Sequence, residues 1–148
     1  MTHDELLADY PSRISLPIQW GDMDAFNHVN NVVYIRWFES SRIAYLETAG
    51  MRELLTAHGL GPILAAINCS YKRQLVFPGS VTIGARVSNV GRTSLTVSHR
   101  VVDDQSVALA AEGESVIVVF DFDNQRPVRM PEDVKEAVGR FQCESVKS

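Results

Sequence analysis

Two carboxylates, one imidazole and three side-chain amides fall within residues 21–31, which read GDMDAFNHVNN. These side chains belong to Asp22, Asp24, Asn27, His28, Asn30 and Asn31. A carboxylate in such a cluster can act as a nucleophile or a general base, and an imidazole can orient water or the carboxylate. The alternative is that the cluster only closes a turn and caps a helix.

The elements on either side of this cluster determine which backbone groups lie beside it. Residues 14–20 alternate apolar and polar side chains, which predicts a half-buried strand ending at Trp20. Residues 32–46 predict a helix that stops at Gly50. The residues predicted to share its buried face are Val32, Ile35, Phe38 and Leu46. The cluster therefore lies at the start of this helix.

A helix start carries unpaired backbone N–H groups and the positive end of the helix dipole. Asn30 or Asn31 is the natural N-cap, because its side-chain oxygen can accept a hydrogen bond from the first turn. Such a terminus favours an anion, or an oxygen on which negative charge develops during a reaction.

The remainder of the chain predicts strands and a second helix. Alternating patterns at 67–74, 81–87, 95–101 and 107–122 predict four strands in consecutive antiparallel hairpins, with a bulge or bend at Gly113. Residues 131–141 predict a terminal helix. Because one long helix must bury its apolar face against the one face of such a sheet, we predict a single α+β domain over residues 1–148.

Composition narrows the classes of function. The formal net charge of −4 argues against nucleic acid as the main partner, which normally meets a basic face. No apolar run approaches the ~20 residues that cross a bilayer, so no membrane partner is expected. The N-terminal residues lack the basic and apolar regions of a signal peptide, which predicts a cytoplasmic protein.

Other cofactor and nucleophile patterns are weak. The two cysteines form no zinc-type spacing, and the two aspartates near His28 have no third carboxylate in register, so we expect neither a metal nor an organic cofactor. The surroundings of Ser115 do not form the GxSxG turn of serine hydrolases.

The run GDMDAFNHVNN, followed by Tyr34, Trp37, Phe38 and Glu39, resembles hotdog-fold acyl-CoA thioesterases of the 4-hydroxybenzoyl-CoA thioesterase type. The later stretches 68–74, 78–81 and 90–94 resemble the same family at its strands and turns. The resemblance implies a curved antiparallel sheet of about five strands around a central helix, with sites between subunits of a dimer.

The resemblance also implies roles for particular residues. Asp24 is the expected catalytic carboxylate, and the backbone amide near Asn31 is expected to polarise the thioester carbonyl. Apart from the resemblance, the imidazole of His28 is expected to orient water or the carboxylate. Asp22 is expected to hold the loop. The residues expected to bind substrate are Asn27, Asn30, Tyr34, Arg73 and Arg92, the two arginines through the phosphates of coenzyme A.

Three functions remain open at this point. The first is hydrolysis of an acyl-CoA to a carboxylic acid and coenzyme A. The second is a non-catalytic module that binds acyl-CoA or acyl carrier protein, and the third is a hotdog dehydratase or hydratase. For each we expect a homodimer or homotetramer, because exposed sheet edges, which we place at 81–87 and 95–101, favour pairing between subunits.

Overall fold

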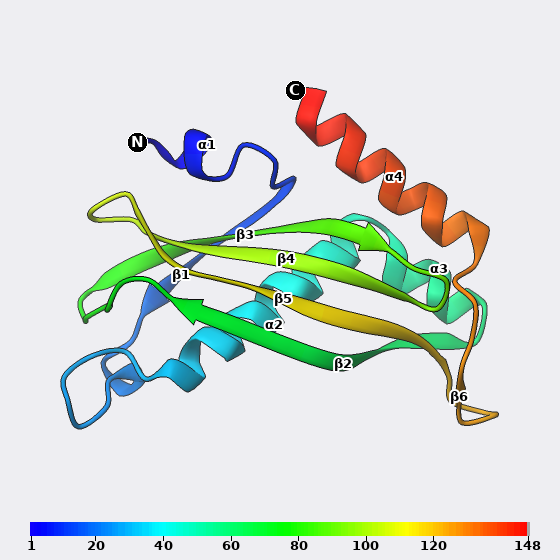
Figure 1. Cartoon of the computed structure of the whole chain (residues 1–148), viewed down its shortest axis with the longest axis horizontal. Coiled ribbons are helices and arrows are strands. Elements are labelled where there is room, and N and C mark those ends of the chain that lie inside the picture. The colour runs from blue at the N-terminus through cyan, green and yellow to red at the C-terminus, as the bar shows by residue number, and fades with distance from the viewer. Residues whose placement is uncertain (148) are drawn as a thin grey trace.

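The computed structural model describes the backbone of residues 1–147 and the side chains of residues 1–143. A curved antiparallel sheet packs one face on the helix α2, Asn31–Thr48, which runs behind the sheet in Figure 1. The main strands are β1 Ser12–Ile18, β2 Leu60–Tyr71, β3 Gly79–Val90, β4 Ser94–Asp103 and β5 Ala108–Asp121. The smaller elements are α1 His3–Leu6, the 3-10 turn η1 Trp20–Asp22, α3 Met51–Ala57, β6 Arg126–Pro127 and α4 Glu132–Lys147. The predicted α+β arrangement, a curved antiparallel sheet of five main strands around a central helix, is confirmed.

The strand order of the sheet is β1-β3-β4-β5-β2, and the short β6 pairs with β5. The β3–β4 and β4–β5 connections are hairpins, as predicted. The prediction fails for β2, which does not pair with β3 because β1 occupies that side of β3. Instead β2 pairs with β5, so the two edges of the sheet are β1 and β2. The strands that we expected to be edges, 81–87 and 95–101, lie inside the sheet.

The central helix buries a continuous aromatic stripe against the sheet. Trp37 is 3% exposed, and Phe38 and Tyr45 are fully buried. Each fully buried side chain of this size stabilises the fold by roughly 1.5–3 kcal/mol. Val32, which we predicted on the buried face, is 66% exposed, because Val33 and Tyr34 form the buried face of the first turn instead. After the helix, Gly50 adopts φ 80°, a left-handed conformation that turns the chain into α3.

Two local predictions along the strands need correction. The first strand ends at Ile18, and Trp20 lies in η1 with 77% of its surface exposed. Gly113 is no bulge: it pairs regularly with His99 and Cys69. A Cβ on Gly113 would lie 2.1 Å from the Asn68 carbonyl oxygen, so glycine is needed there for close strand approach. The observed register shifts lie elsewhere, near Ala65, Ser88 and Ala110.

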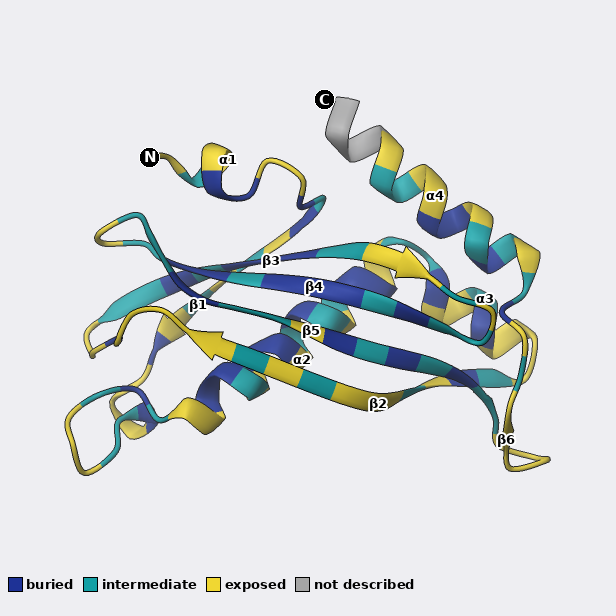
Figure 2. Ribbon diagram, in the orientation of Figure 1, coloured by how far each residue is buried: buried dark blue, intermediate teal, exposed yellow. Residues whose placement is uncertain are grey.

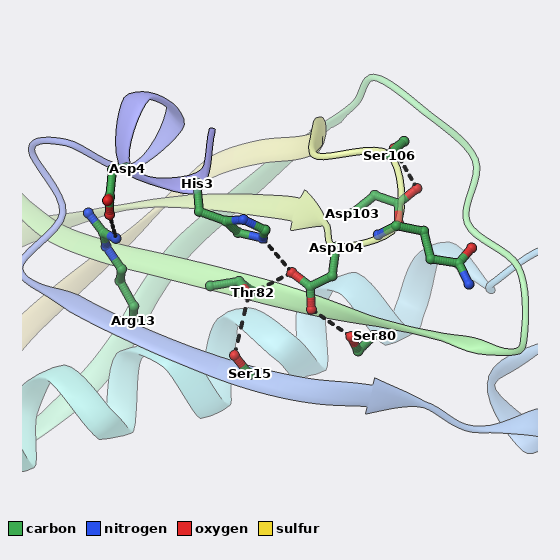
Figure 3. A network of polar contacts seen from close by, with 10 residues as sticks. His3, Asp4, Arg13, Ser15, Ser80, Thr82, Asp103, Asp104 and Ser106 are labelled. Atoms are coloured by element: carbon green, nitrogen blue, oxygen red, sulfur yellow. Dashed lines mark hydrogen bonds and ion pairs between the residues drawn. The ribbon is translucent and has the colours of Figure 1, made fainter. Parts of the chain in front are cut away.

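One of the contacts that hold the N-terminal segment to the sheet runs through the Asp104 carboxylate (Figure 3). Asp104 accepts hydrogen bonds from His3 at 2.7 Å, Ser80 at 2.6 Å and Thr82 at 2.7 Å. Burial of Asp104 raises its pKa, but these hydrogen bonds together outweigh that effect, and the pKa lies below its usual value. The N-terminal segment is thereby fixed to the turn between β4 and β5.

At the other end of the molecule, α4 packs beside α3 and along β3. Gln142 accepts hydrogen bonds from the Tyr45 hydroxyl at 2.6 Å and from the Val87 amide at 2.8 Å. This contact covers the part of β3 that extends beyond β1. Over the described residues, no helix has both the length and the apolar character needed to cross a membrane.

Candidate active site

The loop between β1 and α2 is held by Asp22, which is 4% exposed. One carboxylate oxygen of Asp22 accepts from the Gln19 amide and the other from the Arg36 guanidinium, both at 2.8 Å. The Asp22 carbonyl accepts from the Asn30 amide at 2.9 Å. Asp22 therefore ties the loop to its own start and to the second turn of α2, the structural role expected of it. Arg36 was not singled out by the sequence.

Asp24 lies in a tight turn at the middle of this loop. Its amide donates to the His28 carbonyl at 2.9 Å, and its carbonyl accepts from the Asn27 amide at 3.1 Å. Carboxylate oxygen Oδ1 accepts from the Phe26 amide at 2.8 Å. Oxygen Oδ2 accepts no hydrogen bond from the described residues. The turn thus fixes the carboxylate by one oxygen and leaves the other open for chemistry.

The start of α2 leaves the Asn31 backbone donor free among the described residues. Asn30 is the N-cap, and its side-chain oxygen accepts from the Val32 amide at 3.1 Å. The Asn30 carbonyl accepts from the Val33 amide at 2.9 Å. The Asn31 amide has no hydrogen-bond partner among the described residues. An unpaired N–H at this point adds to the helix dipole and can bind a developing negative charge.

Asp24 and Asn31 line the same open pocket of about 490 Å³. The loop and helix also contribute Phe26, His28, Val29 and Tyr34, and the segment at the end of β2 contributes Tyr71, Lys72, Arg73 and Gln74. Five predicted site residues are therefore brought together: Asp24, His28, Asn31, Tyr34 and Arg73. Tyr71 and Gln74 also line the pocket, although the sequence did not single them out. They lie there because β2 pairs with β5 at the edge of the sheet, a position that the sequence pattern does not predict.

The other predicted binding residues do not line this pocket. Asn27 is exposed with φ 65°, a left-handed conformation that asparagine tolerates, and it closes the Asp24 turn. Asn30 caps the helix. Arg92 lies in the β3–β4 turn, where its carbonyl accepts from the Met130 amide at 2.9 Å, and it does not line the pocket.

The pocket combines aromatic walls with a basic rim. The Tyr34 and Tyr71 rings meet edge to face, with centroids 5.0 Å apart. Burial, followed by the neighbouring Cys69, raises the pKa of each tyrosine to about 12, so both hydroxyls stay protonated at neutral pH. Lys72 and Arg73 have their nearest carboxylates 3.8 Å away and are about half exposed, which leaves both cations accessible to a ligand.

A second hollow, of about 450 Å³, lies on the face of the sheet opposite α2. Arg86, Arg100, Glu112 and Glu114 line it, so it presents charges of both signs. Unlike the pocket at the start of α2, it combines no open carboxylate with a free helix-start amide. The pocket lined by Asp24 and Asn31 is therefore the candidate active site.

Sequence comparison places this geometry in a known group of proteins. The profile of the thioesterase-like superfamily matches residues 18–138. The chain belongs to this superfamily. The chain is similar to the long-chain acyl-CoA thioesterase FadM of Escherichia coli, with 24% identity over 114 residues, which cover 77% of this chain and 86% of FadM.

Solved structures of thioesterases share the fold. A Thermus thermophilus thioesterase complexed with coenzyme A and Zn is 27% identical, with a TM-score of 0.77 over 91% of this chain and 97% of that one. The DHNA-CoA thioesterase of Staphylococcus aureus is 19% identical, with a TM-score of 0.78 over 92% and 93% of the two chains, and supports the fold alone. The profile match establishes the superfamily, while the narrower 4-hydroxybenzoyl-CoA type remains a prediction.

Proposed function

We propose that this thioesterase-superfamily protein hydrolyses acyl-CoA thioesters in the pocket at the start of α2. The observation that carries the proposal is that an open carboxylate oxygen on Asp24 and an unpaired amide on Asn31 belong to residues lining one pocket. Negative charge develops on the thioester oxygen when its carbonyl carbon is attacked. A free N–H at a helix start stabilises that charge without having to reorganise.

The Asp24 carboxylate promotes attack on the thioester carbonyl carbon in one of two ways. As a general base it takes a proton from water while the water oxygen bonds to the carbonyl carbon. As a nucleophile it forms a mixed anhydride, which water then opens. In both routes the carbon–sulfur bond breaks, coenzyme A leaves as the protonated thiol, and the acyl group leaves as a carboxylic acid. In this proposal His28, which also lines the pocket, orients the water.

The basic rim of the pocket supports coenzyme A as the group that carries the acyl chain. Lys72 and Arg73 are exposed cations beside Asp24, suited to the phosphates of the carrier. The coenzyme A complex of the Thermus relative and the acyl-CoA activity in the name of FadM support the same class. For Arg92, at the other end of the sheet, we propose contact with substrate bound to a neighbouring subunit.

A panel of short-chain, long-chain and aromatic acyl-CoAs with a thiol reagent tests the proposal. We expect free thiol to be released from at least one class, and turnover of aromatic substrates tests the 4-hydroxybenzoyl-CoA type. Saturable binding without thiol release would instead identify a non-catalytic acyl-CoA or carrier-protein module. Hydration of an enoyl-CoA without thiol release would identify a hydratase.

The proposed reaction uses no metal or organic cofactor. Asp22 is already engaged by Arg36 and the Gln19 amide, which removes it as a partner for Asp24 in holding a metal. Within the described residues, no group of three His, Cys, Asp or Glu side chains is arranged to hold a metal ion. Activity is therefore expected to survive EDTA and dialysis. Loss of activity that one divalent ion restores would make Asp24 and His28 metal ligands instead.

A further inference from the structure

Two tyrosines join the end of β2 to the start of α2 in opposite directions. Tyr71, the last residue of β2, donates from its hydroxyl to the Asn31 carbonyl at 3.0 Å. Tyr34, in the first turn of α2, donates to the Arg73 carbonyl at 3.3 Å. The two rings are in edge contact, at an interplanar angle of 74°. The strand end and the helix start are thus linked directly beside the pocket.

The Tyr71 hydroxyl binds the carbonyl of Asn31, the residue whose amide stabilises the thioester oxygen in our proposal. The Asn31 carbonyl and the Val32 amide form one peptide plane, and the Val32 amide is itself bound by the Asn30 side chain. The plane that follows Asn31 is therefore held at its oxygen by Tyr71 and at its nitrogen by the N-cap. Within α2 the Asn31 carbonyl is also the helical acceptor for the Ile35 amide, so the Tyr71 bond adds a link from the end of β2 to a plane that the helix and the N-cap already hold.

We propose that Tyr71 is a positioning residue for catalysis, which holds the start of α2 so that the Asn31 amide meets the thioester oxygen. This inference rests on the proposed function. Tyr71 touches the helix through a neutral hydroxyl and does not exchange a proton in the reaction. Because hydrogen bonds to a developing oxyanion depend on close geometry, a small rotation of the first turn lowers kcat more than it weakens substrate binding.

The test compares Tyr71→Phe with Tyr45→Phe. Tyr71→Phe removes the hydroxyl and keeps the ring against Tyr34. Tyr45→Phe removes a hydroxyl bond from the far end of the same helix, where Tyr45 donates to Gln142 at 2.6 Å, away from the pocket. Loss of one such bond at the site is expected to lower kcat by about 5–10-fold, with KM changed by less than about twofold. Tyr45→Phe is expected to lower the melting temperature and leave kcat unchanged.

Amide hydrogen exchange gives a second measurement that does not depend on activity. In Tyr71→Phe, the Val32 and Val33 amides are expected to exchange faster than in the wild type, while Tyr45→Phe leaves them unchanged. A kcat within twofold of wild type, or unchanged exchange at these amides, would overturn the role of Tyr71. If the wild type releases no thiol from any acyl-CoA, the proposed function fails, and with it a role in catalysis. The exchange comparison then decides only whether Tyr71 orders the helix start.

Discussion

His99, a residue of β4, has 1% of its surface exposed. Its ring stacks on the Phe38 ring of α2, with the ring centroids 4.6 Å apart. Its nitrogens contact the hydroxyls of Ser115 at 2.9 Å and Ser41 at 3.3 Å. A neutral imidazole can donate to one hydroxyl and accept from the other. Burial, followed by the nearby Arg42 charge, lowers the pKa of His99 from 6.5 to about 3. His99 is therefore a neutral polar link in the core.

This burial predicts how stability depends on pH. Between pH 6.5 and about 3 the unfolded chain binds a proton at His99 that the folded chain does not. The free energy of unfolding therefore falls as the pH falls through this window, by up to roughly 1.4 kcal/mol per pH unit from this residue. Urea titrations of wild type and His99→Gln between pH 5 and 7 measure the difference in slope. Equal slopes in the two proteins would contradict the assignment.

At the scale of single residues, the sequence predicted those parts of the candidate site whose residues lie close together in the chain. Asp24, His28 and Asn31 share one loop, so their types and the helix that follows predict a site without long-range contacts. Tyr71 lies forty positions after Asn31, and its alternating strand pattern does not show which edge the strand occupies. The Asp22–Arg36 bond was missed for a related reason, because the side-chain direction of Arg36 depends on how the loop folds back onto the helix.

At the scale of elements, Gly113 sets how closely β5, β2 and α2 approach. An added Cβ there would lie 2.1 Å from the Asn68 carbonyl oxygen and 2.8 Å from the Phe38 ring. Gly139 is exposed in α4 with no atom within 4 Å of an added Cβ, so it provides the matched control.

Gly113→Ala is expected to destabilise the protein by about 1–3 kcal/mol through overpacking, or roughly 2–12 °C in melting temperature. Gly139→Ala is expected to stabilise it by about 0.5–1 kcal/mol, because alanine has the higher helix propensity. Thermal unfolding of both variants checks the pair. A neutral Gly113→Ala would show that the strands are free to separate there.

Strand existence was predictable from alternation, but strand order was not. The patterns at 81–87 and 95–101 became the interior strands β3 and β4, because β1 and β5 add to their outer sides. The strand β2 began seven residues earlier than its alternation indicated and passes through Pro62. Proline is tolerated there because β2 is an edge strand, a position that only the whole sheet defines.

At the scale of the molecule, β2 is an edge strand that carries proline only near its start, at Pro62. Its residues, LGPILAAINCSY, include no charged side chain, and Leu64, Ala65 and Ala66 are exposed. Figure 2 shows exposed and half-buried residues along much of this strand. The opposite edge, β1, carries Arg13 and Pro17, which discourage further pairing. We therefore predict that two copies associate through β2, as a dimer or as part of a tetramer.

Sedimentation at micromolar concentration tests this assembly. Ala66→Lys is expected to weaken it by adding a charge to the β2 edge, whereas Ser15→Lys on β1 is expected to leave it intact. If sites are shared between subunits, mixing Asp24→Asn chains with Arg92→Ala chains restores part of the activity. A fully active monomer would contradict both expectations.

The central claim is that the Asp24 carboxylate drives thioester hydrolysis, and Asp24→Asn tests it most directly. The amide keeps the size of the side chain and an oxygen for the Phe26 amide, but it has neither the charge nor the basicity that either route needs. The measurement is kcat on the best acyl-CoA substrate, with Asp123→Asn in the exposed β5–β6 turn as the control. A loss of at least ~100-fold in Asp24→Asn alone, with an unchanged melting curve, is predicted. Near-normal turnover by Asp24→Asn would contradict the account.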